Sequence, residues 1–265
     1  RTLTTLLPEV SSAQLLPLVT QLGAQPALSA PALQELLSQQ PLALAPQAWT
    51  QLSETVTLTG SLHSLLPDLT SVQLLPLAQQ LTTLTTLTPT TVHELLTTQG
   101  LTVAPQHLSR FIDTLTLTGT LQTLAPELST TQLVPLATTL LDFQPGGVSA
   151  MQELVRAQSL PLEPPALTRL TDTLTLAGAL QRELPQLTTA QLVPFANDVA
   201  QLPALTGPAL TALIRAQPLN VEPPQLSRLT ETLAFTDALQ RELPGFSTAQ
   251  LLPVAQELMS ASQSA

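Results

Sequence analysis

The side chains in this sequence best suited to metal binding or acid–base chemistry are three histidines, His63, His93 and His107. Two imidazoles on adjacent helices can chelate a metal ion. The sequence recurs with a 59-residue period, however, and other residue types stand at the equivalent positions. These are Gln122, Gln181 and Gln240 for His63, Gln34 and Gln152 for His93, and Ala48, Ala166 and Gln225 for His107. Because the histidines replace polar or small side chains, we expect them to face solvent and we predict no metal site.

A catalytic serine would need a base that is itself held by an acid in one pocket. The hydroxyl residues recur at periodic positions, whereas the histidines are confined to one stretch. An active site is normally unique in a chain, and periodic residues do not meet that condition. The pair Gly146-Gly147 is interpreted as a loop and not as a phosphate-binding motif. We therefore predict that the chain is not an enzyme and uses no cofactor.

The most ordered charges are arginines that recur with the 59-residue period, each followed three residues later by an acid. The pairs are Arg110 with Asp113, Arg169 with Asp172, and Arg228 with Glu231. On an exposed helix face such an i, i+3 pair contributes a few tenths of a kcal/mol. One interpretation is a solvated, stabilising pair. The other is a row of arginines that binds acidic groups of a partner protein, which makes these six residues the candidate partner-binding site.

Composition excludes several classes of protein. The chain has 265 residues, a net charge of −10, no lysine and no cysteine, and 43 % of its residues are hydrophobic. An acidic surface repels phosphate backbones, so we predict no nucleic-acid partner. No run of 18 apolar residues occurs, so we predict no membrane insertion. Without cysteine there are no disulfides. We expect an extracellular or cell-surface location slightly more than a cytoplasmic one.

The period itself is the strongest signal in the sequence. The motif Gln-Leu-x-Pro begins at Gln14 and returns once in each period as far as Gln250, without insertion or deletion. We therefore interpret residues 1–265 as one array of tandem repeats, since a fixed period of this length is typical of units that pack mainly on their neighbours. The expected boundaries are a partial repeat 1–10, repeats at about 11–69, 70–128, 129–187 and 188–246, and a partial repeat 247–265.

Hydrophobic spacing predicts a mostly α fold with about four short helices in each repeat. Helix a follows a capping box such as Ser129/Gln132 and carries apolar residues at i, i+3, i+4 and i+7. Helix b carries Val92, Leu95 and Leu96 in the second repeat. Helix c begins near Pro105, a residue suited to a first helical turn. Helix d follows it and is stopped by Pro126. Two helical hairpins per repeat predict a solenoid.

Two features conflict with this interpretation. A proline such as Pro76 falls about six residues into every helix a, so that helix is either kinked or restarted at the proline. Residues 114–118 read Thr-Leu-Thr-Leu-Thr, and residues 101–103 also alternate, which is a strand signal. Short extended segments at these junctions and a β-solenoid therefore remain open alternatives.

Tandem helical hairpins with regular leucine columns resemble the α-solenoid class, the armadillo and HEAT type of architecture. Residues 187–193, Leu-Thr-Thr-Ala-Gln-Leu-Val, are similar to the opening of a TAL-effector repeat. This repeat is longer than theirs, lacks their base-reading loop and is acidic, which argues against DNA binding. Leu-Ser/Thr-x-x-Gln-Leu steps are also similar to those in mesothelin- and stereocilin-like surface proteins.

Two functional hypotheses follow from the sequence. The first is a structural repeat protein that assembles with itself into a fibre, stalk or surface filament; the apolar Leu3, Leu6 and Leu7 at the N-terminal end lead us to expect that end to seek a covering surface. The second is a binding solenoid that holds a peptide or protein on its concave face, with the arginine column as the contact. Dispersed variation among the repeats favours the first.

Overall fold

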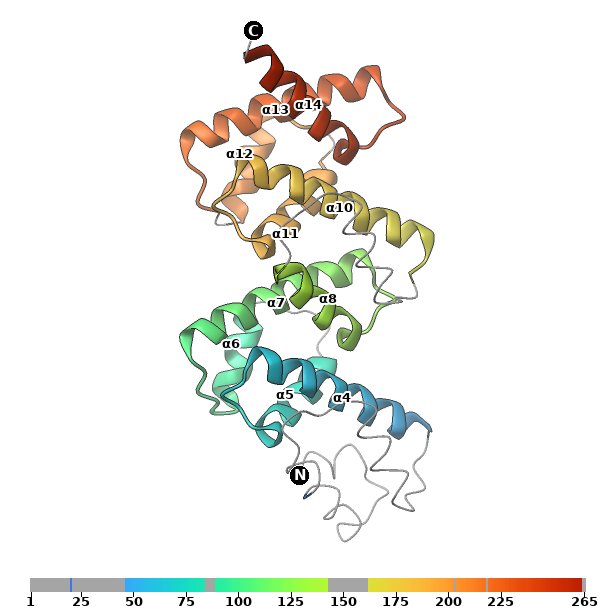
Figure 1. The fold of residues 1–265 in the computed structure, drawn as a ribbon, viewed down its shortest axis with the longest axis vertical. Coiled ribbons are helices and arrows are strands. Elements are labelled where there is room, and N and C mark those ends of the chain that lie inside the picture. Colours follow the sequence, from blue (N-terminus) through green and yellow to red (C-terminus); the bar gives the residue numbers. More distant parts are fainter. Residues whose placement is uncertain are drawn as a thin grey trace. The chain divides into compact units, whose positions relative to one another are not determined.

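A computed structural model shows a mostly helical protein (Figure 1). It describes residues 46–83, 89–142, 162–202, 204–217 and 219–263, together with Thr20. Within these ranges there are ten helices and no strand. The mostly α prediction is confirmed. Residues 114–118 lie inside a helix, which contradicts an extended segment there, and residues 101–103 belong to neither a helix nor a strand.

The helices fall into three kinds. Long helices of 20 residues are α4 (Pro46–Leu65), α7 (Pro105–Leu124), α10 (Pro164–Glu183) and α13 (Pro223–Glu242). Helices with an internal proline are α5 (Ser71–Thr83), α8 (Thr130–Asp142), α11 (Thr189–Ala200) and α14 (Thr248–Gln263). Short helices are α6 (Pro89–Thr98) and α12 (Gly207–Ala216). Each long helix starts one sequence period after the previous one, and so does each proline-containing helix.

Helices c and d, predicted as separate, are a single long helix. α7 runs without a break from Pro105 to Leu124 and ends two residues before Pro126. The Thr-Leu alternation at its centre is helical, and its threonine hydroxyls are bonded within the helix. Thr114 Oγ1 donates to the Arg110 carbonyl at 2.8 Å, and Thr118 Oγ1 donates to the Thr114 carbonyl at 2.7 Å. A threonine bonded in this way can be buried in a helix without an unsatisfied hydroxyl.

The proline-containing helices are capped as the sequence predicts. The glutamine of each capping box accepts a bond from the backbone N–H of the Ser or Thr three residues earlier, at 3.0 Å in all four described copies: Thr70/Gln73, Ser129/Gln132, Thr188/Gln191 and Ser247/Gln250. The helices continue through their prolines, so the restart alternative is wrong. Pro76, for example, is the sixth residue of α5 and frees only the Val72 carbonyl near the helix start.

The chain divides into two compact units, one made of Arg1–Gly119 with Ser129–Ala137 and the other of Thr120–Leu128 with Thr138–Ala265. In the first unit, leucines of α4 and α5 pack with Phe111 and Leu115 of α7 and with Val92 and Leu96 of α6. In the second unit, α14 packs on α10 and α13, α11 packs on α10, and α12 contacts α11 and α13. In the second unit α10 therefore packs against α11, α13 and α14.

Candidate functional site

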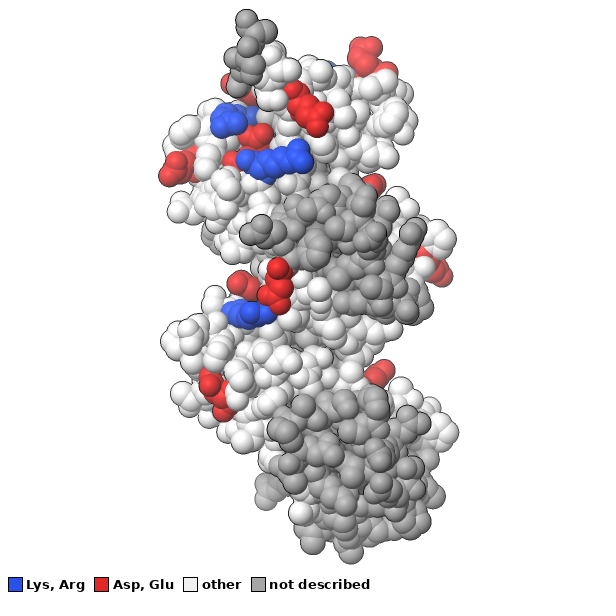
Figure 2. Space-filling model, viewed as in Figure 1, with Lys and Arg blue, Asp and Glu red and all other residues white. Residues whose placement is uncertain are grey.

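The six predicted site residues lie on three long helices, in two separate units. Arg110 and Asp113 are on α7, Arg169 and Asp172 on α10, and Arg228 and Glu231 on α13. The three arginines and Glu231 are exposed, whereas the two aspartates are half-buried. On the face of the molecule drawn in Figure 2, charged side chains are few and most described atoms belong to uncharged residues.

The predicted i, i+3 pairing is wrong for two of the three arginines. Arg169 Nε donates to the Pro165 carbonyl of its own helix at 3.4 Å and forms no described ion pair with Asp172. Arg228 pairs with Glu183 of α10, with 3.8 Å between Nη2 and Oε2, and forms no described ion pair with Glu231. The Glu183 side chain is only 11 % exposed, so it reaches Arg228 from a sheltered position that a sequence pattern on α13 does not reveal.

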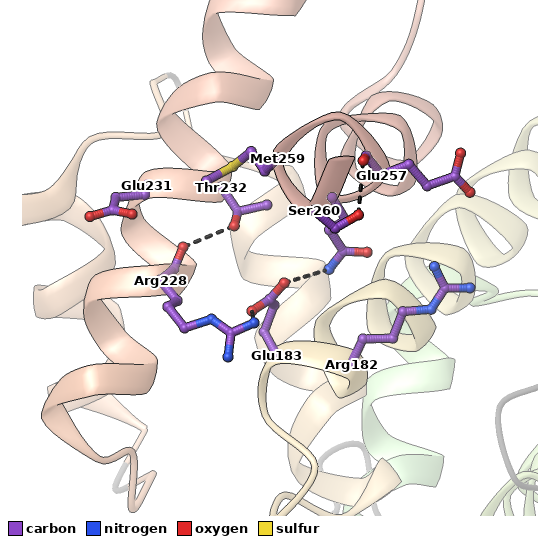
Figure 3. Close-up of a pocket in the computed structure, with 9 residues that line it drawn as sticks. Arg182, Glu183, Arg228, Glu231, Thr232, Glu257, Met259 and Ser260 are labelled. Carbon is purple, nitrogen blue, oxygen red and sulfur yellow. Dashed lines mark hydrogen bonds and ion pairs between the residues drawn. The ribbon is translucent and has the colours of Figure 1, made fainter. Parts of the chain in front are cut away.

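Glu183 joins three helices of the second unit (Figure 3). The Gln256 amide of α14 donates to Glu183 Oε1 at 3.3 Å and to the Ala179 carbonyl at 2.9 Å. Together with the ion pair to Arg228, one carboxylate on α10 therefore contacts α13 and α14. A cavity of about 260 Å³ lies beside this junction, lined among others by Arg182, Arg228, Glu231 and Glu257.

The junction contains one unsatisfied polar atom. Gln256 Oε1 is buried and has no hydrogen-bond partner. The orientation of its amide is fixed, because Nε2 already faces two acceptors and the flipped amide would place an oxygen against them. A donor supplied by a ligand in the cavity could satisfy Oε1, and Arg182 and Arg228 could hold a carboxylate beside it. These groups define the candidate binding site of the second unit.

The two half-buried aspartates have perturbed acidities. Burial raises the pKa of the Asp113 carboxyl above its ordinary value. Burial also raises the pKa of Asp172, and a hydrogen bond from the Ser247 side chain opposes that rise. Both residues therefore carry a desolvation cost when charged. Neither aspartate belongs to a described cluster of further titratable groups, so we assign no acid–base chemistry to them.

The three histidines are not grouped. His93 is exposed, as expected. His63 and His107 are half-buried and hydrogen-bonded, so the prediction that they face solvent is only partly correct. His63 Nδ1 lies 3.2 Å from the Leu69 carbonyl, and His107 Nδ1 lies 2.7 Å from Asp68 Oδ2. Among the described residues no group of three His, Cys, Asp or Glu side chains could hold a metal ion.

A second surface feature is apolar and lies at the end of the second unit. Large apolar side chains that are between 37 % and 51 % exposed gather on α13, on the turn after it and on α14. We call these residues the terminal face: Phe235, Leu243, Phe246, Val254 and Leu258. They lie at the orange-to-red end of the ribbon in Figure 1.

The terminal face differs from its own equivalents earlier in the sequence. Moving each of its residues back by one, two or three periods gives fifteen apolar residues, and every one of them is at most 4 % exposed. Phe235, for example, corresponds to Leu58, Leu117 and Leu176, each 0 % exposed. The sequence analysis placed the exposed apolar end at the N-terminus and missed this one.

Comparison with protein families, with characterised proteins and with solved structures finds no match for this chain. No helix in the described ranges is long and apolar enough to cross a membrane. The candidate sites therefore rest on their own geometry.

Proposed function

We propose that this chain is a non-catalytic helical repeat protein, a solenoid of 59-residue units, that assembles with further copies of itself into an extended structure. The terminal face carries this proposal. A folded unit that leaves five large apolar side chains exposed on two adjoining helices and the turn between them gains free energy when they are covered. The equal spacing of the helix starts supports the repeat interpretation, because each unit then offers its neighbour the same surface.

A uniform array also suits a structural role. Head-to-tail contacts between identical chains form a ring only when the rotation between copies brings the last copy back to the first. For any other rotation they produce filaments. The scarcity of charge in the chain as a whole lowers the desolvation cost of such contacts, since only 10 % of its residues are charged.

Negative-stain electron microscopy and light scattering over a range of protein concentrations test this function. We expect rods or filaments whose length increases with concentration. Because the net charge is −10, copies repel one another at low ionic strength, and added salt should promote assembly. A constant mass of 28.0 kDa at every concentration and salt level would refute the proposal.

A binding module is the second candidate, favoured by the cavity at the Glu183 junction. There the partner would supply a carboxylate to Arg182 and Arg228 and a donor to Gln256 Oε1. Calorimetric titration with a short acidic peptide tests it: the peptide should bind wild type, and Arg182→Gln should weaken binding. Absence of heat with the wild-type protein removes this candidate.

A further inference from the structure

Glu183 stands at a position where two other long helices carry a buried leucine. Moving back from it by one and two sequence periods gives Leu124, 5 % exposed, and Leu65, 1 % exposed. A carboxylate in such a sheltered place has a desolvation cost that a leucine does not have. Since leucine fills this position in α4 and α7, packing of a long helix does not require the charge, and the carboxylate points to another role.

The carboxylate of Glu183 orients the side-chain amide of Gln256. Gln256 Nε2 donates to Glu183 Oε1 and to the Ala179 carbonyl, so both of its hydrogens are used. Gln256 Oε1 therefore faces away from these acceptors, and it is buried without a hydrogen-bond partner. Gln256 lines the cavity of about 260 Å³ between α10, α13 and α14. The lining thus includes an acceptor that is held in place and lacks a donor.

Two opposite charges line the same cavity without pairing. Arg182 of α10 and Glu257 of α14 form no side-chain ion pair or hydrogen bond with each other or with any other residue that the structure describes. Figure 3 shows Arg182 and Arg228 on opposite sides of Glu183, and Glu183 pairs with Arg228 only. The cavity therefore has one cation and one anion whose partners are missing.

The hydroxyl groups of the lining do not supply the missing donor. Thr232 Oγ1 and Ser260 Oγ each donate to a backbone carbonyl of their own helix, at 2.9 Å and 2.8 Å. Arg182 does not bond Gln256 Oε1 either. An occupant that satisfies this lining has to offer an anionic group to Arg182 and N–H groups to Gln256 Oε1 and Glu257.

The volume and the charges define the class of occupant. About 260 Å³ is below the range of about 300–1,000 Å³ of typical ligand sites, so the occupant is small. An ammonium group has three donors, enough for both Gln256 Oε1 and the Glu257 carboxylate. A carboxylate fits the guanidinium of Arg182. A molecule with both groups is neutral overall and brings no net charge into the cavity.

We propose that the cavity between α10, α13 and α14 binds a small zwitterion of the free α-amino acid class, with its carboxylate on Arg182 and its ammonium group on Gln256 Oε1 and Glu257. Glu183 and Arg228 act as positioning residues that fix the Gln256 amide. This inference rests on the cavity of the second candidate function and replaces the acidic peptide with a small molecule. It does not depend on self-assembly.

Saturation-transfer NMR on the full chain tests the ligand class with L-alanine, L-leucine and L-glutamate as probes. The tightest binder is then compared with two analogues, one without the ammonium group and one without the carboxylate; for L-leucine these are 4-methylpentanoate and 3-methylbutylamine. Because each analogue loses a charge-assisted contact, it should bind at least about tenfold more weakly than the amino acid.

Three variants locate the site. In Arg182→Gln the amino acid should lose its advantage over the amine, and in Glu257→Gln it should lose its advantage over the carboxylate. Arg215→Gln is the matched control, because it makes the same charge change at an exposed position of α12 that is not part of the lining, and it should bind like wild type. Arg182 and Glu257 are also exposed, and circular dichroism checks that all three variants are folded.

The outcomes separate this inference from the second candidate function. If an amino acid binds and the acidic peptide does not, the inference stands and the peptide-binding candidate is removed. If the peptide binds and no probe does, the inference is overturned and that candidate stands; if neither binds, both are removed. An analogue that binds as tightly as its amino acid overturns the zwitterion class, and an equal loss of binding in Arg215→Gln and Arg182→Gln overturns the site.

Discussion

Leu184 and Leu243 form a matched pair that tests whether the terminal face is an uncovered copy of an internal surface. Each is the first residue after a long helix, with φ −125° in both and ψ of 60° and 65°. Each backbone N–H bonds a leucine carbonyl four residues earlier, at 2.9 Å and 2.8 Å. Leu184 is 0 % exposed and Leu243 is 44 % exposed. Residue type and backbone are therefore constant while burial changes.

The expected cost of truncation follows from burial. Leu184→Ala removes a fully buried side chain and leaves a cavity, so it should cost about 2–5 kcal/mol. Leu243→Ala removes the same three carbons. At about 0.8 kcal/mol per buried CH₂ group, full burial of three carbons contributes about 2.4 kcal/mol of transfer free energy. Since nearly half of that side chain is already in water and no closed cavity results, its cost should be about 1 kcal/mol. The difference between the two variants should therefore be about 1–4 kcal/mol.

Urea unfolding followed by circular dichroism measures this difference, at a protein concentration low enough to keep the chain monomeric. Both leucines lie in the second unit, so they report on the same structure. The dependence of the unfolding free energy on urea should be unchanged in both variants. Equal losses in the two variants would show that Leu243 is covered in the monomer and would refute the reasoning. At concentrations where wild type assembles, the free-energy cost of Leu243→Ala should increase.

Two other predictions concern the long helices. Thr59 is 0 % exposed, and its hydroxyl donates to the Thr55 carbonyl at 2.7 Å. Thr59→Val should change the unfolding free energy by less than about 1 kcal/mol. The reason is that the Thr55 carbonyl keeps its backbone hydrogen bond within the helix when the hydroxyl is removed, so no buried polar group loses its partner. Fluorescence of Trp49, the single tryptophan and a residue of the same helix, reports the unfolding transition. A loss of several kcal/mol of unfolding free energy would mean that the hydroxyl has another role. Burial raises the pKa of Asp113 in the folded protein above its ordinary value of 3.8. The folded protein therefore gains stability relative to the unfolded chain as pH falls through the raised pKa toward 3.8. Asp113→Asn should therefore raise the melting temperature at neutral pH and lose this advantage in acid, and a gain that is independent of pH would contradict the assignment.

Local signals in the sequence predicted much of the helical structure. Pro46, Pro105, Pro164 and Pro223 begin their helices because a first turn needs no N–H at that position. The capping glutamines bind the backbone three residues away, a contact that sequence spacing alone fixes. These features depend on near neighbours in the chain, so they can be recognised without the fold.

Other local signals were misleading because tertiary packing decides between competing propensities. The alternation at Thr114–Thr118 fits a strand as well as a helix, and burial of Leu115 and Leu117 within one continuous helix determined the outcome. The prolines of α5, α8, α11 and α14 fit either a break or a continuous helix. In α5 the leucines on either side of Pro76, Leu75 and Leu77, are both buried in one continuous helix, which spacing could not show.

The sequence by itself predicted the mostly helical class and the helix caps, and its composition excludes disulfides, because each is a property of composition or of short spacings. Only the tertiary structure decided which residues meet. Glu183 lies on α10, far along the chain from Gln256 on α14, and the sequence analysis paired it with neither Gln256 nor Arg228. Likewise, Leu184 and Leu243 are the same residue in the same column, and one is buried while the other is exposed because burial depends on what covers the surface.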